Sequence, residues 1–443
     1  MKFKLQNFIK INLLVIICFS LQTLKAYSMN EPEFIKVKGM HFFIGEKKYL
    51  FIGTNFWYGS YLGLDEKGRE RLIRELDNLK EIGITNLRIL GASETSYLKN
   101  TLQPVFQPEP NIYNENLLEG LDFLLNEMNK RNMYAVIILN NYWEWSGGFL
   151  SYNYWTDLVQ KVDPENQTNG WKDFMNYSAS FYQNEKGNEL FRNYVRMLIK
   201  RKNKFNGKYY FEDPTIMAWQ LANEPRPGYS VENIDNQKNY YEWINETAKF
   251  IKSIDNNHLI SIGSEGVVGS LQIDSIYFNA HKSEYIDYNT FHIWAKNWDW
   301  YDPKDPDKTY IKAKEKVTKY YNEHLLLSRK LNKPIVLEEF GLSRDFDNYN
   351  INEKTTYRDD YYKFIFDLVE DSIKVNSAIA GTNFWAWAGE GRNINSNYKW
   401  EVGNPFTGDP PHEPQGLYSV FDVDLSTIDI LKLHAIKIKN LQE

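Results

Sequence analysis

Cysteine is almost absent from this chain of 443 residues, and its position is informative. The single cysteine, Cys18, lies in an apolar run from Ile11 to Leu21, which three lysines precede and the small residue Ala26 follows. This order is typical of a secretory signal peptide. The run is too short to cross a bilayer comfortably, so we expect residues 1–26 to be cleaved and no membrane segment to remain.

The expected mature chain, residues 27–443, contains no thiol. Disulfides, thiolate metal sites and cysteine nucleophiles are therefore excluded. Lipid anchoring through Cys18 is not expected, because Ile17 stands where a lipoprotein signal has a small residue. We expect a secreted protein, either extracellular or periplasmic.

Several chemistry-bearing motifs are also absent. The seven histidines show neither His-x-x-x-His nor His-x-His spacing, which argues against a metal site. No Gly-rich phosphate loop follows the first expected strand, and no Gly-x-Ser-x-Gly elbow is found. We therefore expect no cofactor, no metal and no serine esterase chemistry.

The mature chain is acidic and has no linker. Without the four lysines of residues 1–26, 48 basic residues stand against 58 acidic ones, which argues against nucleic acid as a partner and permits a neutral ligand. No Pro/Gly/Ser-rich tract divides the chain, so we expect residues 27–443 to form one domain. We also expect this domain to be a monomer.

Aromatic residues are abundant instead. The chain has 13 Trp, 31 Tyr and 26 Phe, which together make 16% of its residues. A core of this size does not need so many rings, so some of them are expected to line grooves or surfaces.

Apolar, β-rich runs alternate with helical patterns along the chain. The runs are Tyr49–Asn55, Thr85–Leu90, Tyr134–Asn140, Ile216–Ala222, Leu259–Gly263, Tyr288–His292, Pro334–Glu339 and Gly381–Trp387. The best helical patterns are Glu66–Ile82, Asn116–Arg131, Asn188–Phe205, Tyr240–Ile254, Tyr310–Leu331, Thr355–Lys374 and Thr427–Lys439. Eight strands separated by helices predict a single α/β (β/α)8 (TIM) barrel, with a doubly wound open sheet as the alternative. Residues Phe34–Lys48 read as an N-terminal β-hairpin that caps the barrel floor.

Polar side chains stand at the ends of these predicted strands. In a barrel of this type the catalytic groups lie there, because the loops that follow the strands converge. The strand-end residues are Asn55-Phe56-Trp57, Arg88, Asn140-Asn141, Asn223-Glu224-Pro225, His292 with Trp294, Glu338-Glu339-Phe340-Gly341, and Trp385 with Trp387. An unpaired charge inside an apolar run is costly, so these groups are expected to be paired for a purpose.

Two carboxylates follow strands on opposite sides of the expected barrel mouth, Glu224 and Glu339. Cleavage of a glycosidic bond needs one neutral carboxyl to protonate the leaving oxygen and one ionised carboxyl at the anomeric carbon. Glu338 competes with Glu339 for the second role. Strand alternation points adjacent side chains to opposite faces, and we expect Glu339 to be the one that faces the mouth.

These motifs resemble glycoside hydrolase family 5, a family of retaining (β/α)8 glycosidases, and within it the endo-β-1,4-mannanases. The motifs that carry the resemblance are Gly53-Thr54-Asn55-Phe56-Trp57, Asn140-Asn141-Tyr142-Trp143, Asn223-Glu224-Pro225-Arg226, Phe291-His292-Ile293-Trp294, Glu338-Glu339-Phe340-Gly341 and Gly381-Thr382-Asn383-Phe384-Trp385-Ala386-Trp387. They cover about residues 34 to 441. Six ordered motifs at strand ends are a specific signal, whereas an isolated Asn-Glu-Pro is a weak one.

The resemblance implies that Glu224 is the acid/base and Glu339 the nucleophile, and that Asn223 binds the sugar's 2-hydroxyl. Arg88, always charged, is expected to hold the nucleophile ionised. His292 is expected to lie near both acids and tune their charges, the alternative being an ordinary core histidine.

Five tryptophans and one arginine are expected to line the substrate site. Trp385 would form the stacking floor for the sugar, with Trp387 as second choice, because an indole face matches the apolar face of a pyranose. Trp294 stands where many relatives carry tyrosine and is expected to line the site only, since its indole can donate but not accept.

The remaining candidates come from loops. Trp57 and Trp143 would line the glycone side, and packing is an equal alternative for each. Arg226 would bind hydroxyls on the leaving side or make an ion pair across its loop.

The sequence thus predicts a secreted, retaining endo-β-1,4-mannanase acting on mannan, glucomannan or galactomannan. An endo-β-1,4-glucanase of the same family is the first alternative, because sugar preference depends on loop geometry. A barrel that binds glycan without cleaving it is the second, and the presence of both Glu224 and Glu339 argues against it.

Overall fold

The computed structural model describes residues 33–156, 161–165, 170–232 and 234–442, and residues Phe34–Glu443 group as one compact unit. The predicted signal peptide and its cleavage site lie outside the described residues. Among the described helices, none is both long and apolar enough to cross a membrane.

Eight parallel strands form the central sheet, in the order β8-β7-β6-β5-β4-β11-β10-β9. They are β4 (Phe51–Asn55), β5 (Asn86–Leu90), β6 (Tyr134–Ile138), β7 (Ile216–Gln220), β8 (Leu259–Ser261), β9 (Asn289–Ile293), β10 (Ile335–Phe340) and β11 (Ile379–Phe384). A parallel bridge between Ser261 and Tyr288 joins the two edge strands. The sheet therefore closes, and the predicted barrel is confirmed over the open-sheet alternative.

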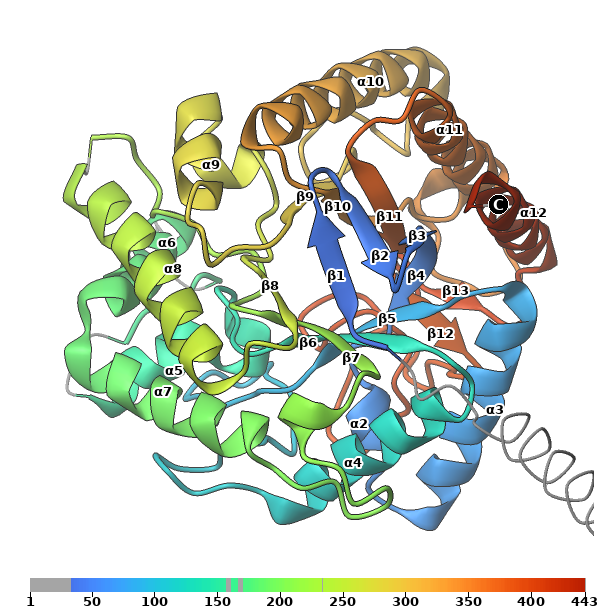
Figure 1. Ribbon diagram of the computed structural model, residues 1–443. Coiled ribbons are helices and arrows are strands. Elements are labelled where there is room, and N and C mark those ends of the chain that lie inside the picture. Colours follow the sequence, from blue (N-terminus) through green and yellow to red (C-terminus); the bar gives the residue numbers. More distant parts are fainter. Residues whose placement is uncertain (1–32, 157–160, 166–169, 233, 443) are drawn as a thin grey trace, which may run out of the picture. The chain divides into compact units, whose positions relative to one another are not determined.

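Each barrel strand leads to a helix on the outside of the barrel (Figure 1). The helices are α3 (Glu66–Ile82), α4 (Glu115–Asn129), α7 (Glu185–Ile199), α8 (Ile234–Ile254), α9 (Asp274–His281), α10 (Pro306–Leu331), α11 (Thr356–Lys374) and α12 (Leu425–Gln442). α3 has the predicted bounds because its signals are strong: Asp65 accepts a hydrogen bond from the Gly68 amide, and Gly83 ends the helix with a φ of 97°. The short α9 was not predicted, since eight residues give little periodicity.

The N-terminal cap has three antiparallel strands instead of the two of the predicted hairpin. They are β1 (Ile35–Lys38), β2 (His41–Ile44) and β3 (Lys47–Tyr49). Phe42 of this cap is fully buried, with its ring 5.2 Å from that of Tyr288 and 6.5 Å from that of Phe51. These contacts seal the end of the barrel where the strands begin, so the opposite end holds the mouth (Figure 1).

Two long connections surround the mouth. Residues 139–184, between β6 and α7, carry the 3-10 helix η1 (Glu144–Ser146) and the helices α5 (Gly148–Trp155) and α6 (Gly170–Ala179). Residues 385–424, between β11 and α12, carry the short strands β12 (Trp387–Gly389) and β13 (Val420–Phe421). Neither insertion was predicted, and both contribute walls to the site.

Candidate active site

Arg88 of β5 is the central cation of the barrel mouth. It is fully buried, and its guanidinium donates to the side-chain oxygens of Asn55 at 3.0 Å, Gln220 at 2.8 Å and Asn223 at 2.8 Å. It also donates to a carboxylate oxygen of Glu339. The guanidinium thereby fixes four strand-end side chains. Its charge also favours the ionised form of the Glu339 carboxyl, as expected.

Glu338 and Glu339 both remain on the barrel side of β10, which corrects the alternation argument. The pairing with β9 shifts between Leu337 and Glu339, and a bulge of this kind re-aims the side chains that follow it. Glu338 accepts two hydrogen bonds from Gln220, at 2.9 and 2.7 Å, inside the barrel. Glu339 lines the cavity above, as expected.

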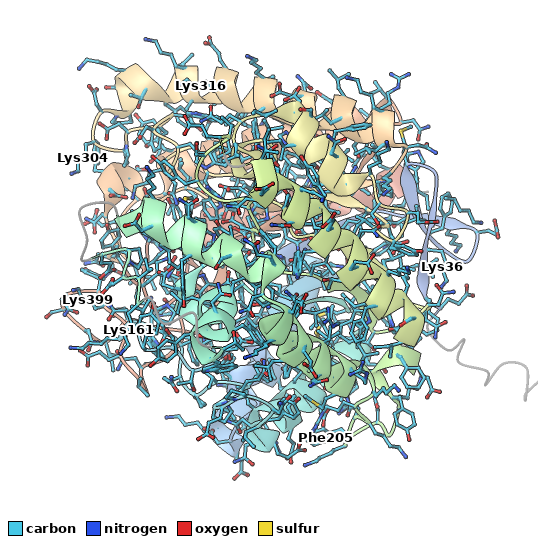
Figure 2. The ribbon with its side chains drawn as sticks, turned by 90° about the vertical axis from the view of Figure 1, so that its left-hand side faces the viewer. Lys36, Lys161, Phe205, Lys304, Lys316 and Lys399 are labelled. Atoms are coloured by element: carbon cyan, nitrogen blue, oxygen red, sulfur yellow. The ribbon has the colours of Figure 1, made fainter. Side chains whose placement is uncertain are left out.

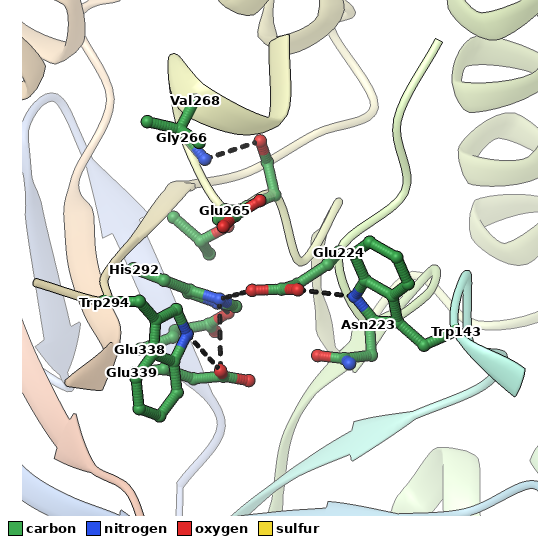
Figure 3. Close-up of polar contacts among 12 residues, drawn as sticks. Trp143, Asn223, Glu224, Glu265, Gly266, Val268, His292, Trp294, Glu338 and Glu339 are labelled. Atoms are coloured by element: carbon green, nitrogen blue, oxygen red, sulfur yellow. Dashed lines mark hydrogen bonds and ion pairs between the residues drawn. The ribbon is translucent and has the colours of Figure 1, made fainter. Parts of the chain in front are cut away.

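Glu224 lies just beyond the end of β7, with a φ of 51° and a backbone amide that donates to the Gly263 carbonyl at 2.9 Å. Its carboxylate receives one hydrogen bond of 2.6 Å from the indole of Trp143 and meets His292 Nδ1 at 2.6 Å on the other oxygen (Figure 3). Both oxygens of the acid are therefore held in place.

His292 lies between the two acids in Figure 3. Its Nδ1 is 2.6 Å from Glu224 and 3.3 Å from Glu339, and its Nε2 is 3.9 Å from Glu338. Burial alone would lower the pKa of His292, but the charges of Glu339 and Glu224 outweigh it and raise that pKa to about 10. The imidazole is thus a second buried cation beside Arg88.

The carboxyl groups of Glu224 and Glu339 lie close together: one oxygen of each is within 4.8 Å of the other and of a His292 nitrogen. Burial would raise the pKa of Glu224, but the hydrogen bond and the charge of His292 lower it. Burial raises the pKa of Glu339 against the charges of His292 and Arg88. Among these three groups, the directions of the shifts favour a protonated His292 and an ionised Glu224. These three side chains are also close enough to share a cation, and Arg88 already pairs with Glu339.

A cavity of about 500 Å³ opens above these groups. The sequence-predicted residues that line it are Trp143, Asn223, Glu224, Arg226, Trp294, Glu339 and Trp385. Trp294 donates from Nε1 to Glu339 at 3.2 Å, and its ring meets that of Trp385 edge to face with centroids 6.0 Å apart. The walls thus combine flat aromatic faces with two carboxylates, a chemistry suited to sugars.

Two predicted tryptophans lie elsewhere. Trp57 is 1% exposed and donates from Nε1 to the Gly408 carbonyl at 2.5 Å, and Trp387 is 1% exposed and donates to Glu75 at 2.8 Å. Among the described residues that line the cavity, neither is included. The expectation for Trp387 fails because β11 ends at Phe384, so alternation does not extend to it. Trp57 is a packing residue, which was the alternative expected for it.

Arg226 makes the ion pair that was its alternative role, and its partner is a residue that the sequence analysis missed. It pairs with Glu265, and its guanidinium lies 4.9 Å from the centre of the Trp143 ring. Glu265 also accepts from Trp298 at 3.0 Å, and burial raises its pKa to about 7 although Arg226 opposes this. The signal was available, because Glu265 follows the fifth predicted strand, Leu259–Gly263, as the other acids follow theirs.

Three further cavity residues come from the connection between β11 and α12: Pro410, His412 and Glu413. Burial raises the pKa of Glu413 well above its usual range. No strand end points to these residues, so sequence reasoning had no means of finding them.

Known proteins are similar to this chain in sequence and in fold. The sequence model of the family described as "GH family 5 beta-mannosidase-like" matches residues 32–443. A Mannan endo-1,4-beta-mannosidase 5 from Solanum lycopersicum is 28% identical over 394 residues, which are 85% of this chain and 87% of that protein.

Solved structures agree. A Glycoside Hydrolase Family 5 Mannosidase from Rhizomucor miehei has 35% identity and a TM-score of 0.84, covering 92% of this chain and 98% of the other. An endo-beta-1,4-mannanase from Thermotoga petrophila has 25% identity and a TM-score of 0.65, covering 89% and 77%. The family resemblance of the sequence is confirmed, and this chain belongs to family 5 of the glycoside hydrolases, in its β-mannosidase-like group.

Proposed function

We propose that this enzyme cleaves β-mannosidic bonds by double displacement, with retention of the anomeric configuration. The observation that carries the proposal is the approach of Glu224 and Glu339, whose nearest oxygens lie within 4.8 Å of each other at the base of an aromatic-lined cavity. Retaining enzymes need carboxyl groups about 5 to 5.5 Å apart, whereas inverting enzymes leave room for a water at about 6.5 to 9.5 Å.

Glu339 acts as the nucleophile. Arg88 and the indole of Trp294 each donate to one of its oxygens, which favours the carboxylate form and aims it into the cavity. In the first step, a Glu339 oxygen bonds to the anomeric carbon as the bond to the leaving oxygen breaks. In the second step, water breaks that ester and restores the carboxylate.

Glu224 acts as the acid and then as the base. His292 Nδ1 lies 2.6 Å from one carboxylate oxygen of Glu224, within reach for proton exchange. Glu224 passes a proton to the leaving oxygen in the first step and takes one back from the attacking water in the second. His292 is placed to orient Glu224 and to exchange a proton with it.

The substrate we propose is β-1,4-linked mannan, glucomannan or galactomannan, cleaved at internal bonds outside the cytoplasm. The names of the plant relatives support the mannan backbone, and the basic-apolar N-terminal segment supports export. A second candidate is release of single mannose units from chain ends. Two observations favour it. Pro410, His412 and Glu413 line the cavity from a long loop, and the similar R. miehei protein is named a mannosidase.

A substrate panel tests the proposal. We expect reducing sugar from mannan and little from carboxymethylcellulose, with a fast viscosity drop for internal cleavage and mannose alone for the end-acting candidate. NMR of the first product should show the β anomer. An α product would contradict retention, and preferred cleavage of carboxymethylcellulose would reassign the enzyme to the glucanases.

Activated aryl mannosides separate the two acids. Glu224→Ala should give a burst of aryl leaving group followed by slow turnover, because departure needs no proton but the second step needs the base. Azide should restore turnover and yield a β-glycosyl azide. If Glu339→Ala gives the burst while Glu224→Ala is silent, the two roles must be exchanged.

A further inference from the structure

Two exposed aromatic side chains stand at the rim of the catalytic cavity. Trp171 of α6 is 48% exposed and Tyr229, in the loop after β7, is 51% exposed, and both contribute to the cavity lining. Single exposed aromatics are ordinary on protein surfaces, but two at one cavity edge are an available stacking surface. Neither residue has a role in the mechanism above.

Trp171 contacts Trp143, which in turn binds the acid Glu224. Its ring meets the edge of the Trp143 ring with centroids 5.8 Å apart and an interplanar angle of 78°, and Trp143 donates to Glu224 at 2.6 Å. Phe174 supports Trp171 from its own helix, at 5.8 Å and 87°. The indole is therefore held in one orientation although half of it faces solvent.

Tyr229 is fixed to the same helix. Its backbone amide donates to the Asn176 side chain of α6 at 3.1 Å. The preceding Gly228 has a φ of 103°, and a Cβ there would meet Asn176 at 3.1 Å and Asn236 at 3.0 Å, so the loop packs tightly against its neighbours. The loop that carries Tyr229 is thus tied to the helix that carries Trp171.

The cavity also continues outward at this point. Tyr229 lines both the catalytic cavity and an adjoining open groove, whose other residues include Lys172, Asn176 and Glu232. This groove offers polar partners for hydroxyl groups beyond the aromatic rim. A chain that leaves the cavity here would have both stacking faces and hydrogen-bonding groups along its path.

We propose that Trp171 and Tyr229 form a sugar-binding subsite on the leaving-group side, which holds a pyranose of the chain beyond the unit that departs. The inference rests on the proposed function, because Glu224 protonates the departing oxygen and so marks the leaving side. Trp143, which was expected on the glycone side, instead donates to Glu224 and contacts Trp171. The subsite favours long substrates, since a short leaving group does not reach it.

Substrate length tests the subsite. For Trp171→Ala and Tyr229→Ala, we expect the ratio of kcat/KM for mannohexaose to kcat/KM for an aryl β-mannoside to fall about tenfold each, since the aryl group ends before the rim. Trp171→Phe should keep part of the ratio, because a ring remains. The matched control is Tyr209→Ala, which removes an aromatic side chain 41% exposed in the loop before β7, at the other end of the barrel.

An unchanged ratio in both rim variants would overturn the proposal, as would an equal loss on both substrates. Calorimetric titration with mannohexaose keeps the subsite separate from the proposed function. If the wild type hydrolyses no mannoside but binds mannohexaose at least tenfold more tightly than Trp171→Ala, the function falls and the subsite stands. Equal affinities, or no binding by either protein, would remove the subsite.

Discussion

The two ends of the same barrel strands have opposite chemistry. On β10, Val336 packs in the apolar floor cluster with Phe42 and Tyr288, and three residues later Glu339 faces the mouth. Figure 2 shows the two ends from the side, with Lys36 of the N-terminal sheet at the right and Lys304 and Lys399 of the loops at the left. One strand therefore serves stability at its start and chemistry at its end.

The difference lies in what each end buries. The floor buries rings and aliphatic side chains, which stabilise the fold by about 25 cal/mol for each Å² removed from water. The mouth buries Glu224, Glu338 and Glu339 with the cations Arg88 and His292. Buried ion pairs are weak stabilisers, because desolvation offsets their attraction. Substitutions at the floor should thus change stability, and substitutions at the mouth should change catalysis.

The largest expected effect is at the mouth. Glu339→Gln should lower kcat by about 10⁵-fold with every substrate, because the covalent intermediate cannot form. Glu338→Gln is the matched control: its carboxylate binds Gln220 inside the barrel, so it should cost much less. Steady-state kinetics of both variants on an aryl mannoside measure the two losses in kcat. If Glu338→Gln shows the larger loss, the reactive acid is one residue earlier.

The floor should respond the opposite way. Phe42→Ala should lower the free energy of unfolding by about 3 to 5 kcal/mol through the cavity it leaves, with kcat at the wild-type value. Phe43→Ala on the same strand, whose ring is only partly buried, should cost far less. Urea unfolding of the three proteins makes the comparison. A Phe42→Ala protein of wild-type stability but reduced kcat would break the division between the two ends.

Substitutions of Trp385 and Trp387 should distinguish a sugar-binding side chain from a structural one. Trp385→Ala should lower kcat/KM by about 10- to 1,000-fold, because the ring lines the cavity beside Trp294. Trp387→Phe loses the hydrogen bond to Glu75 and should lower stability by about 1 to 3 kcal/mol with little kinetic change. Kinetics and thermal unfolding of both variants provide the test. The reverse order would place Trp387, not Trp385, against the sugar.

The last comparison is a pH dependence of stability at the mouth. The folded-state pKa of His292 is raised to about 10 from an ordinary value of 6.5, so its stabilisation is complete below pH 6.5 and is lost as pH rises toward 10. The stability difference between the wild type and His292→Asn should therefore shrink over that window.

His324 is the control for this measurement. Burial lowers its pKa to about 4, so it is neutral in both states above pH 6.5 and His324→Asn should show a constant difference. Unfolding curves at several pH values measure both variants. A constant difference for His292→Asn would mean that no proton is stored between the acids.

Local sequence patterns predicted the barrel and the candidate site residues at its strand ends, but not every part of the site. Apolar periodicity located α3, and apolar β-rich runs located all eight strands, because these signals depend on neighbouring residues. Arg88, Asn223, Glu224, His292 and Glu339 were found because parallel strands bring their ends together.

The remaining parts depend on contacts between distant segments. The bulge at Glu338 and the end of β11 before Trp387 follow from pairing with other strands, which alternation within one strand does not describe. The insertions that carry Trp171 and Glu413 have no periodic signal that relates them to the cavity.

Trapping the covalent intermediate tests the central claim most directly. A 2-deoxy-2-fluoro-β-mannoside with an activated leaving group slows the second step more than the first, so the glycosyl-enzyme should accumulate in the wild type. Mass spectrometry of the digested protein should then find one fluoromannosyl group, attached to Glu339 by an ester. A label on Glu338 or Glu224 would contradict the assignment, and an active enzyme that releases the α anomer without any label would contradict double displacement itself.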